Sequence, residues 1–232
     1  MALAVVLLAA SGASAQDPLV LLPQAYKLAF ENDWVKVVRV HYAPQERLRA
    51  HDHTELAAAY VYLNDGGPVV FKHDYGTSTR PPTVTGSFRL YRAVKEIHEV
   101  ENPNDVPSEF LRVEFKTQPI NANTFGGRYH REDNPMGEAF AKVQFENAQL
   151  RVTRCFLTPG KTLDARTDAE QPALLVALTG GLLKAQAGDD FEPEPGRVRW
   201  LPAGGAASFA NAGASAVELL RFDLKTRPVA AP

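Results

Sequence analysis

The sequence of 232 residues contains one cysteine, Cys155, no extended basic run and no apolar segment long enough to cross a bilayer after the first 15 residues. A single cysteine excludes an internal disulfide framework, a cysteine-rich zinc site and an iron–sulfur cluster. Lys and Arg number 25 against 27 for Asp and Glu, so the basic surface that nucleic-acid binding requires is missing. Any metal must therefore be bound by histidine and carboxylate side chains.

The amino terminus has the features of a secretory signal. An apolar run over residues 4–10 is followed by small residues, and Ala13-Ser14-Ala15 matches the pattern of a signal-peptidase site. We expect residues 1–15 to be removed and the mature protein, which then has no membrane span, to be periplasmic or secreted.

The rest of the chain contains an internal repeat. Phe30-Glu31-Asn32 recurs as Phe145-Glu146-Asn147, a shift of 115 residues, and further matches follow in the same register. Later in the copies a shift of 109 residues places Asn102 on Asn211. Matches in register at this frequency indicate two related domains.

Each copy has the pattern of short β-strands. Residues 34–42 and 150–157 are rich in β-branched and aromatic residues. Residues 57–63 and 69–72 flank Asn-Asp-Gly-Gly, which predicts a hairpin, and residues 173–178 repeat this design. Between the copies, Asn134-Pro135 predicts the start of a short helix over residues 137–142. Strands at this spacing indicate a sandwich or barrel, with jelly rolls among the candidates.

The chemistry is concentrated at His51-Asp52-His53. Residues two apart in a strand face the same side, so both imidazoles project together, and Glu55 continues that face in a regular strand. His98 supplies a third imidazole 45 residues after His53 and is followed by Asn102. Three imidazoles are a donor set for a divalent metal. His51, His53 and His98 are therefore the candidate metal ligands, with Glu55 as a candidate fourth.

Two further residues are candidates for supporting this site. Arg49 precedes the histidines with the same strand parity, which would allow it to meet an anionic substrate. Asn102 is the other, although Asn211 keeps the same residue in the second copy, which indicates a turn-stabilising role.

The His-x-His pair, the nearby carboxylate and the distant histidine followed by asparagine resemble the cupin superfamily, and small bacterial cupins in particular. The resemblance covers residues 25–226, twice over. It implies an all-β protein of two tandem cupin-type jelly-roll β-barrels, a bicupin. The expected parts are a first barrel over residues 21–119, a linker over 120–137, a second barrel over 138–226 and a tail over 227–232. The sequence departs from the family pattern at the usual glutamate, where it has Ala57 and Ala58.

The second copy keeps the family frame but has lost the ligands. Pro202-Ala203-Gly204 and Asn211 follow the second cupin motif. The positions of the three histidines are taken, in order, by Arg166, Asp168 and Ala207. The second barrel is therefore expected to be structural or to bind a small anion.

The resemblance implies one divalent ion in the first barrel and no organic cofactor. Fe(II), Mn(II), Zn(II) and Ni(II) are not distinguished by the sequence, because imidazole binds several of these metals well. Iron would suit an oxygenase acting on a small organic molecule, whereas zinc or manganese would support isomerisation or hydrolysis. The alternative is a non-catalytic bicupin that binds a small ligand or uses the metal structurally. A small molecule is the expected partner in both cases, and homo-oligomer formation is left open.

Overall fold

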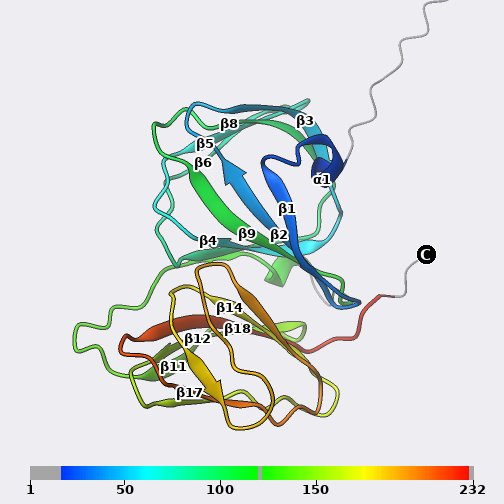
Figure 1. The fold of residues 1–232 in the computed structure, drawn as a ribbon. Coiled ribbons are helices and arrows are strands. Elements are labelled where there is room, and N and C mark those ends of the chain that lie inside the picture. The colour runs from blue at the N-terminus through cyan, green and yellow to red at the C-terminus, as the bar shows by residue number, and fades with distance from the viewer. Residues whose placement is uncertain (1–16, 120–121, 230–232) are drawn as a thin grey trace, which may run out of the picture.

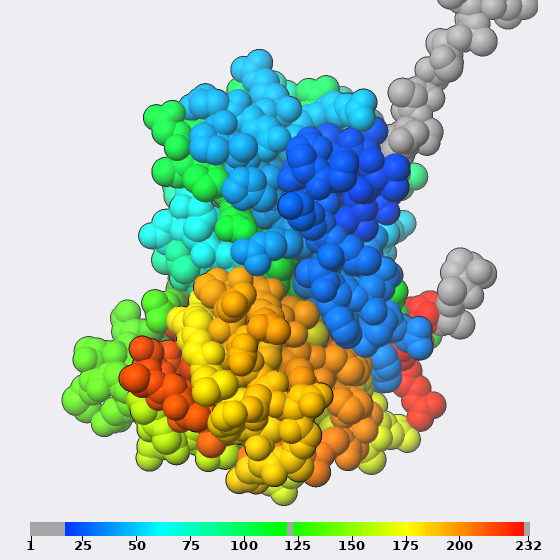
Figure 2. All heavy atoms as spheres, in the orientation of Figure 1, coloured from blue at the N-terminus to red at the C-terminus, as the bar shows by residue number. Residues whose placement is uncertain are grey.

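The computed structural model describes residues 17–119 and 122–229, which form two stacked β-barrels (Figure 1). The space-filling view shows the two bodies in broad contact (Figure 2). The expected signal sequence over residues 1–15 lies outside the described residues. In the part of the chain that the structure describes, no helix is long and apolar enough to span a membrane.

The first barrel consists of two sheets that face each other. The six-stranded sheet contains, in spatial order, β1 (Tyr26–Glu31), β2 (Val35–Tyr42), β9 (Ser108–Phe115), β4 (Ala57–Tyr62), β7 (Phe88–Tyr91) and β10 (Gly127–Tyr129). The four-stranded sheet contains β3 (Arg47–His53), β8 (Glu96–Glu101), β5 (Val69–His73) and β6 (Gly76–Arg80). A one-turn helix, α1 (Pro18–Leu21), precedes the first strand.

The second barrel repeats this arrangement with one strand fewer in each sheet. Its larger sheet contains β11 (Phe140–Glu146), β12 (Leu150–Leu157), β18 (Val217–Leu224), β14 (Ala173–Ala177) and β16 (Val198–Leu201). Its smaller sheet contains β13 (Thr162–Asp164), β17 (Ser208–Asn211) and β15 (Leu183–Ala185). A short 3-10 helix, η1 (Ala122–Thr124), lies between the barrels in sequence.

Details of the internal repeat recur in the two barrels. The first strand pair of each barrel carries a bulge, between Leu28 and Phe30 in one copy and between Val143 and Phe145 in the other. The Asn102 amide donates to the carbonyl oxygens of Tyr42, Ala43 and Val106, and the Asn211 amide donates to those of Leu157 and Ser215. These shared irregularities and turn contacts support the interpretation of the chain as a duplication.

The hairpin predicted across Asn64-Asp65-Gly66-Gly67 is not formed. Strands β4 and β5 belong to different sheets, and the same is true of β14 and β15 in the second barrel. The Asn64 side chain binds the carbonyl oxygen of Pro107 and the backbone N–H of Glu109, which anchors the turn on the start of β9. The turn signal was therefore correct, but the turn carries the chain from one sheet to the other.

The helix predicted in the segment between the barrels is wrong. Phe140–Glu146 is strand β11, and its Phe140 ring stacks on Phe156 of β12 with centroids 5.8 Å apart. The Asn134 side chain accepts from the N–H of Glu138, so Asn134-Pro135 forms a capped turn instead of a helix. Farther upstream, β10 extends the large sheet of the first barrel by pairing with β7.

One continuous apolar core joins the two large sheets. Phe222 of β18 lies against Phe88 and Phe115 of the first barrel, with ring centroids 6.3 and 6.0 Å away. Trp200 of β16 lies near Phe30 and Trp34, at 6.2 and 6.4 Å. The central strands β4 and β9 of one large sheet and β14 and β18 of the other are therefore buried on both faces, because one face lines its own barrel and the other forms the interface.

Candidate metal centre

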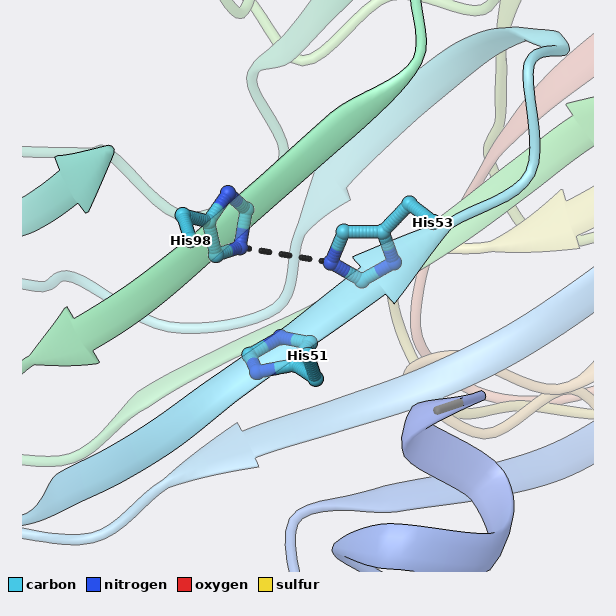
Figure 3. Close-up of side chains that lie close together, drawn as sticks. All are labelled: His51, His53 and His98. Carbon is cyan, nitrogen blue, oxygen red and sulfur yellow. Dashed lines mark hydrogen bonds between the residues drawn. The ribbon is translucent and has the colours of Figure 1, made fainter. Parts of the chain in front are cut away.

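Two adjacent strands of the small sheet bring the three histidines together. Strands β3 and β8 are antiparallel, with His51 directly opposite His98 and His53 opposite Glu96. A register shift between Leu48 and His51 precedes the pair. The three imidazoles point toward one another (Figure 3), and one donor nitrogen from each lies within 4.8 Å of the others. The i, i+2 spacing of His51 and His53 and the cross-strand position of His98 therefore bring the three histidines into one cluster.

Contacts with a backbone carbonyl and with a carboxylate indicate which ring nitrogen of His51 and of His98 is available to bind a metal. Nδ1 of His51 lies 2.9 Å from the carbonyl oxygen of Arg49, so Nδ1 carries the hydrogen and Nε2 has the free lone pair. Nδ1 of His98 lies 3.3 Å from Oε1 of Glu96, which favours the same tautomer. Such contacts of the second ring nitrogen are typical of metal-binding histidines.

The distances between the remaining nitrogens suit a metal ion. Nε2 of His53 and Nε2 of His98 are 3.3 Å apart. Two imidazole nitrogens at about 2.0–2.1 Å from one tetrahedral ion are separated by about 3.3 Å. Nε2 of His51 accepts a hydrogen bond from the Tyr26 hydroxyl at 2.8 Å. The donor set therefore fits a divalent ion once Nε2 of His51 is released from Tyr26.

Burial holds His51 and His53 in the neutral form that binds metals. It lowers the pKa of His51 from 6.5 to about 4, although the contact with the Arg49 carbonyl acts in the opposite direction. Burial, followed by the positive charge of Arg112, places the pKa of His53 well below 6.5. Burial raises the pKa of Glu96, but the neighbouring His98 outweighs it and lowers the pKa overall. Near neutral pH His51 and His53 are therefore neutral beside the carboxylate of Glu96.

These shifts predict an acid-sensitive metal-free protein. His51 binds a proton near pH 6.5 in the unfolded chain but only near pH 4 in the fold. Its stabilising contribution is therefore complete above pH 6.5 and is lost as the pH falls to about 4, and it amounts to at most about 3 kcal/mol. Urea unfolding of chelator-treated protein across this range should show the loss. His51→Asn should reduce the dependence of the unfolding free energy on pH, whereas His41→Asn, at an exposed site, should leave it unchanged. An equal pH dependence in both variants would contradict the assignment to His51.

The other candidate residues from the sequence lie outside the cluster. Glu55 is exposed in the turn after β3, so the carboxylate beside the histidines is that of Glu96 instead. Arg49 is exposed and donates to the carbonyl oxygen of Leu21, and only its own carbonyl oxygen contacts the site. Asn102 is buried, and its side chain binds backbone carbonyls of the turns around it. Asn102 thus supports the fold, as its persistence in the second copy indicated.

Three residues at the site were missed by the sequence analysis. Glu96 has the i, i+2 spacing to His98 that was used for His51 and His53, and this signal could have found it. His73 of β5, which is not one of the predicted ligands, forms a second group with Glu96 and His98. Tyr26 comes from β1, and no local pattern connects it to the histidines.

His53 and His98 open onto a cavity of about 290 Å³ inside the first barrel. Its lining is largely aromatic and includes Tyr60, Tyr62 and Phe110. His53, His98 and Glu96 lie in the same wall. A cavity of this size and lining suits a small organic molecule.

The second barrel has an apolar interior. Leu163, Ala165 and Phe209 pack in its core, next to the partly buried Ala207. Arg166 is exposed and pairs with Asp164. Both groups of potential metal ligands found among the described residues lie in the first barrel.

Comparisons with known proteins establish the fold. No protein-family model matches the sequence, and no curated protein matches it either. Among solved structures, a cupin 2 conserved barrel domain protein from Leptotrichia buccalis is 15% identical, with a TM-score of 0.54 over 87% of this chain and 88% of that chain. The pirin YhhW from Escherichia coli, in complex with nickel(II), is 14% identical, with a TM-score of 0.60 over 88% and 91%. Salicylate 1,2-dioxygenase from Pseudaminobacter salicylatoxidans is 14% identical, with a TM-score of 0.54 over 83% of this chain and 71% of that chain.

At such identities the likeness shows the fold alone. The chain is all-β and folds as two tandem cupin-type jelly-roll barrels. The resemblance noted in the sequence is therefore confirmed at the level of the fold.

Proposed function

We propose that this bicupin binds one divalent metal ion through His51, His53 and His98 and uses it to act on a small organic molecule in the first barrel. The observation that supports this most directly is the convergence of three imidazole nitrogens within 4.8 Å of one another, at a cavity that His53 and His98 line. Three protein ligands leave coordination positions for a substrate or water. We also propose that the chain is exported, on the signal-like pattern of residues 1–15.

The chain's own residues would prepare this site for chemistry. The Arg49 carbonyl orients the ring of His51 so that its Nε2 faces the cluster, and the Glu96 carboxylate lies 3.3 Å from Nδ1 of His98. Burial raises the pKa of Tyr26, so its hydroxyl remains a proton donor beside His51. When bound, a divalent ion would supply Lewis acidity or, if it is iron, a site for oxygen chemistry.

Oxygenase activity is the specific reaction class that we propose. Salicylate 1,2-dioxygenase shares the fold, and its name describes oxygen chemistry on a small aromatic acid. The nickel complex of YhhW shows that this fold also binds other divalent ions. The identity of the metal in this chain therefore decides between oxygen chemistry and Lewis-acid chemistry.

Metal analysis tests the proposal. Full-length protein purified without chelator should contain about one equivalent of divalent metal per chain, as expected for a single three-imidazole site. His51→Ala should lose the metal, because it removes one of three ligands, whereas His41→Ala, at an exposed position of β2, should retain it. Elemental mass spectrometry of the three proteins provides the measurement. Substoichiometric metal that survives His51→Ala would contradict the proposal and favour a non-catalytic bicupin.

A further inference from the structure

Arg80 is a buried cation without a carboxylate partner among the described residues. It ends strand β6, is 6% exposed and lines the cavity that contains the histidines. Its Nη2 donates to the Ser108 hydroxyl at 2.7 Å, whereas its Nε has no partner. The guanidinium lies 5.3 Å from the ring centroid of Tyr62 and 5.6 Å from that of Phe110. A neutral hydroxyl and two rings compensate only part of the cost of burying a charge.

Two more arginines lie side by side on neighbouring strands of the six-stranded sheet, which faces the sheet that contains Arg80. Arg89 of β7 is the direct cross-strand partner of Arg128 of β10, and both line the cavity. Like charges in directly opposite positions destabilise a strand pair. Neither arginine has an ion-pair partner in the described part of the chain; Arg89 instead stacks over Tyr91, 4.7 Å from its centroid. The two strands would be held together better with an anion between these side chains.

The acidic residues near the cavity are already engaged. Tyr60 of β4 lies opposite Arg89 on one side and opposite Arg112 of β9 on the other. Arg112 is paired with Glu114 at 2.9 Å. Glu96 is the one carboxylate among the described residues that line the cavity, and it lies against His98. Positive charge thus remains uncompensated at Arg80, Arg89 and Arg128.

We propose that this cavity binds a small organic carboxylate with a flat apolar body, whose acid group is held by Arg80, Arg89 and Arg128. Arginine matches the planar geometry of a carboxylate, and the aromatic walls match the flat body. As the substrate class of the metal centre, this proposal rests on the function proposed above. As a binding site, it stands on the arginines and the aromatic lining.

Binding of benzoate and of benzamide to the metal-free full-length protein tests the proposal. The two probes have similar shape but differ in charge, and titration followed by ligand-observed NMR detects weak binding. We expect benzoate to bind at least about tenfold more tightly than benzamide, because only benzoate forms charge-assisted hydrogen bonds. Arg80→Met should remove this preference. Arg128→Met should weaken the binding of benzoate but not that of benzamide. Because Arg128 is exposed, its replacement is expected to leave the fold intact, so the proposal stays testable if Arg80→Met does not fold.

Arg92→Met is the matched control. Arg92 is exposed, follows the cavity-lining Tyr91 in sequence and is not part of the lining, so the variant removes the same charge without touching the site. Equal affinity for the two probes, or benzoate binding that is unchanged in both Arg80→Met and Arg128→Met, would overturn the proposal. Displacement of benzoate by equimolar inorganic phosphate would also overturn it, by showing a general anion site.

The same titration separates this proposal from the proposed metal function. Benzoate-selective binding in His51→Ala protein that holds no metal supports the carboxylate site independently of the metal. A protein that contains the predicted metal but shows no preference for benzoate retains the metal function and refutes the carboxylate site.

Discussion

Replacing His98 with alanine is expected to lower the metal affinity of the protein by at least about 100-fold, because even the loss of a residue that only supports a ligand costs about 10- to 100-fold. His98 belongs to both groups of potential ligands, one with His51 and His53 and one with His73 and Glu96. Metal titration of the chelator-treated protein, with a competing chelator to set the range, measures the change.

His73→Ala distinguishes between the two groups. It leaves the three-imidazole set intact, so its metal affinity should stay within about threefold of the wild-type value. His73 and His98 both contact the same cavity, with ring centroids 5.4 Å apart, which makes the pair a close match. A loss in His73→Ala as large as that in His98→Ala would assign the ion to His73, Glu96 and His98. Circular dichroism of both variants establishes that each is folded.

Arg154→Met is expected to cause the largest loss of stability, about 3 to 5 kcal/mol, because it leaves a buried carboxylate without its main partner. Arg154 of β12 is fully buried and binds Glu218 at 2.6 Å. Its Nη2 also donates to the carbonyl oxygen of Gly86 at 2.6 Å, which connects the second barrel to the first. Arg131 pairs with the other oxygen of Glu218 but is half exposed, so it compensates for the loss only in part.

Arg151→Met is the control for this measurement. Arg151 lies on the same strand and pairs with Glu146 at 2.8 Å, but both side chains are exposed to solvent. An exposed ion pair contributes about 0 to 1 kcal/mol. In urea unfolding, the losses of unfolding free energy in the two variants should therefore differ by more than about 2 kcal/mol. Similar losses in the two variants would show that the contact between the barrels is unimportant for stability.

The candidate site was predictable to the extent that local spacing and the repeat defined it. The strand period placed His51 and His53 on one side, and the spacing to His98 completed the set. Glu55 was assigned by the same period, but the strand ends at His53 and the chain turns, so its side chain is exposed. Tyr26 could not be found in this way, because its contact with His51 is made between different sheets.

The sequence by itself determined the all-β class, the duplication and the unequal histidine content of the two copies, since these follow from residue types and short-range periodicity. Only the tertiary structure decided that β4 and β5 belong to different sheets, because a turn motif specifies a change of direction and not the partner of each strand. It also decided that Arg80, Arg89 and Arg128 line the cavity of the metal centre. Their side chains come from three strands of two sheets, so the fold alone brings their charges together.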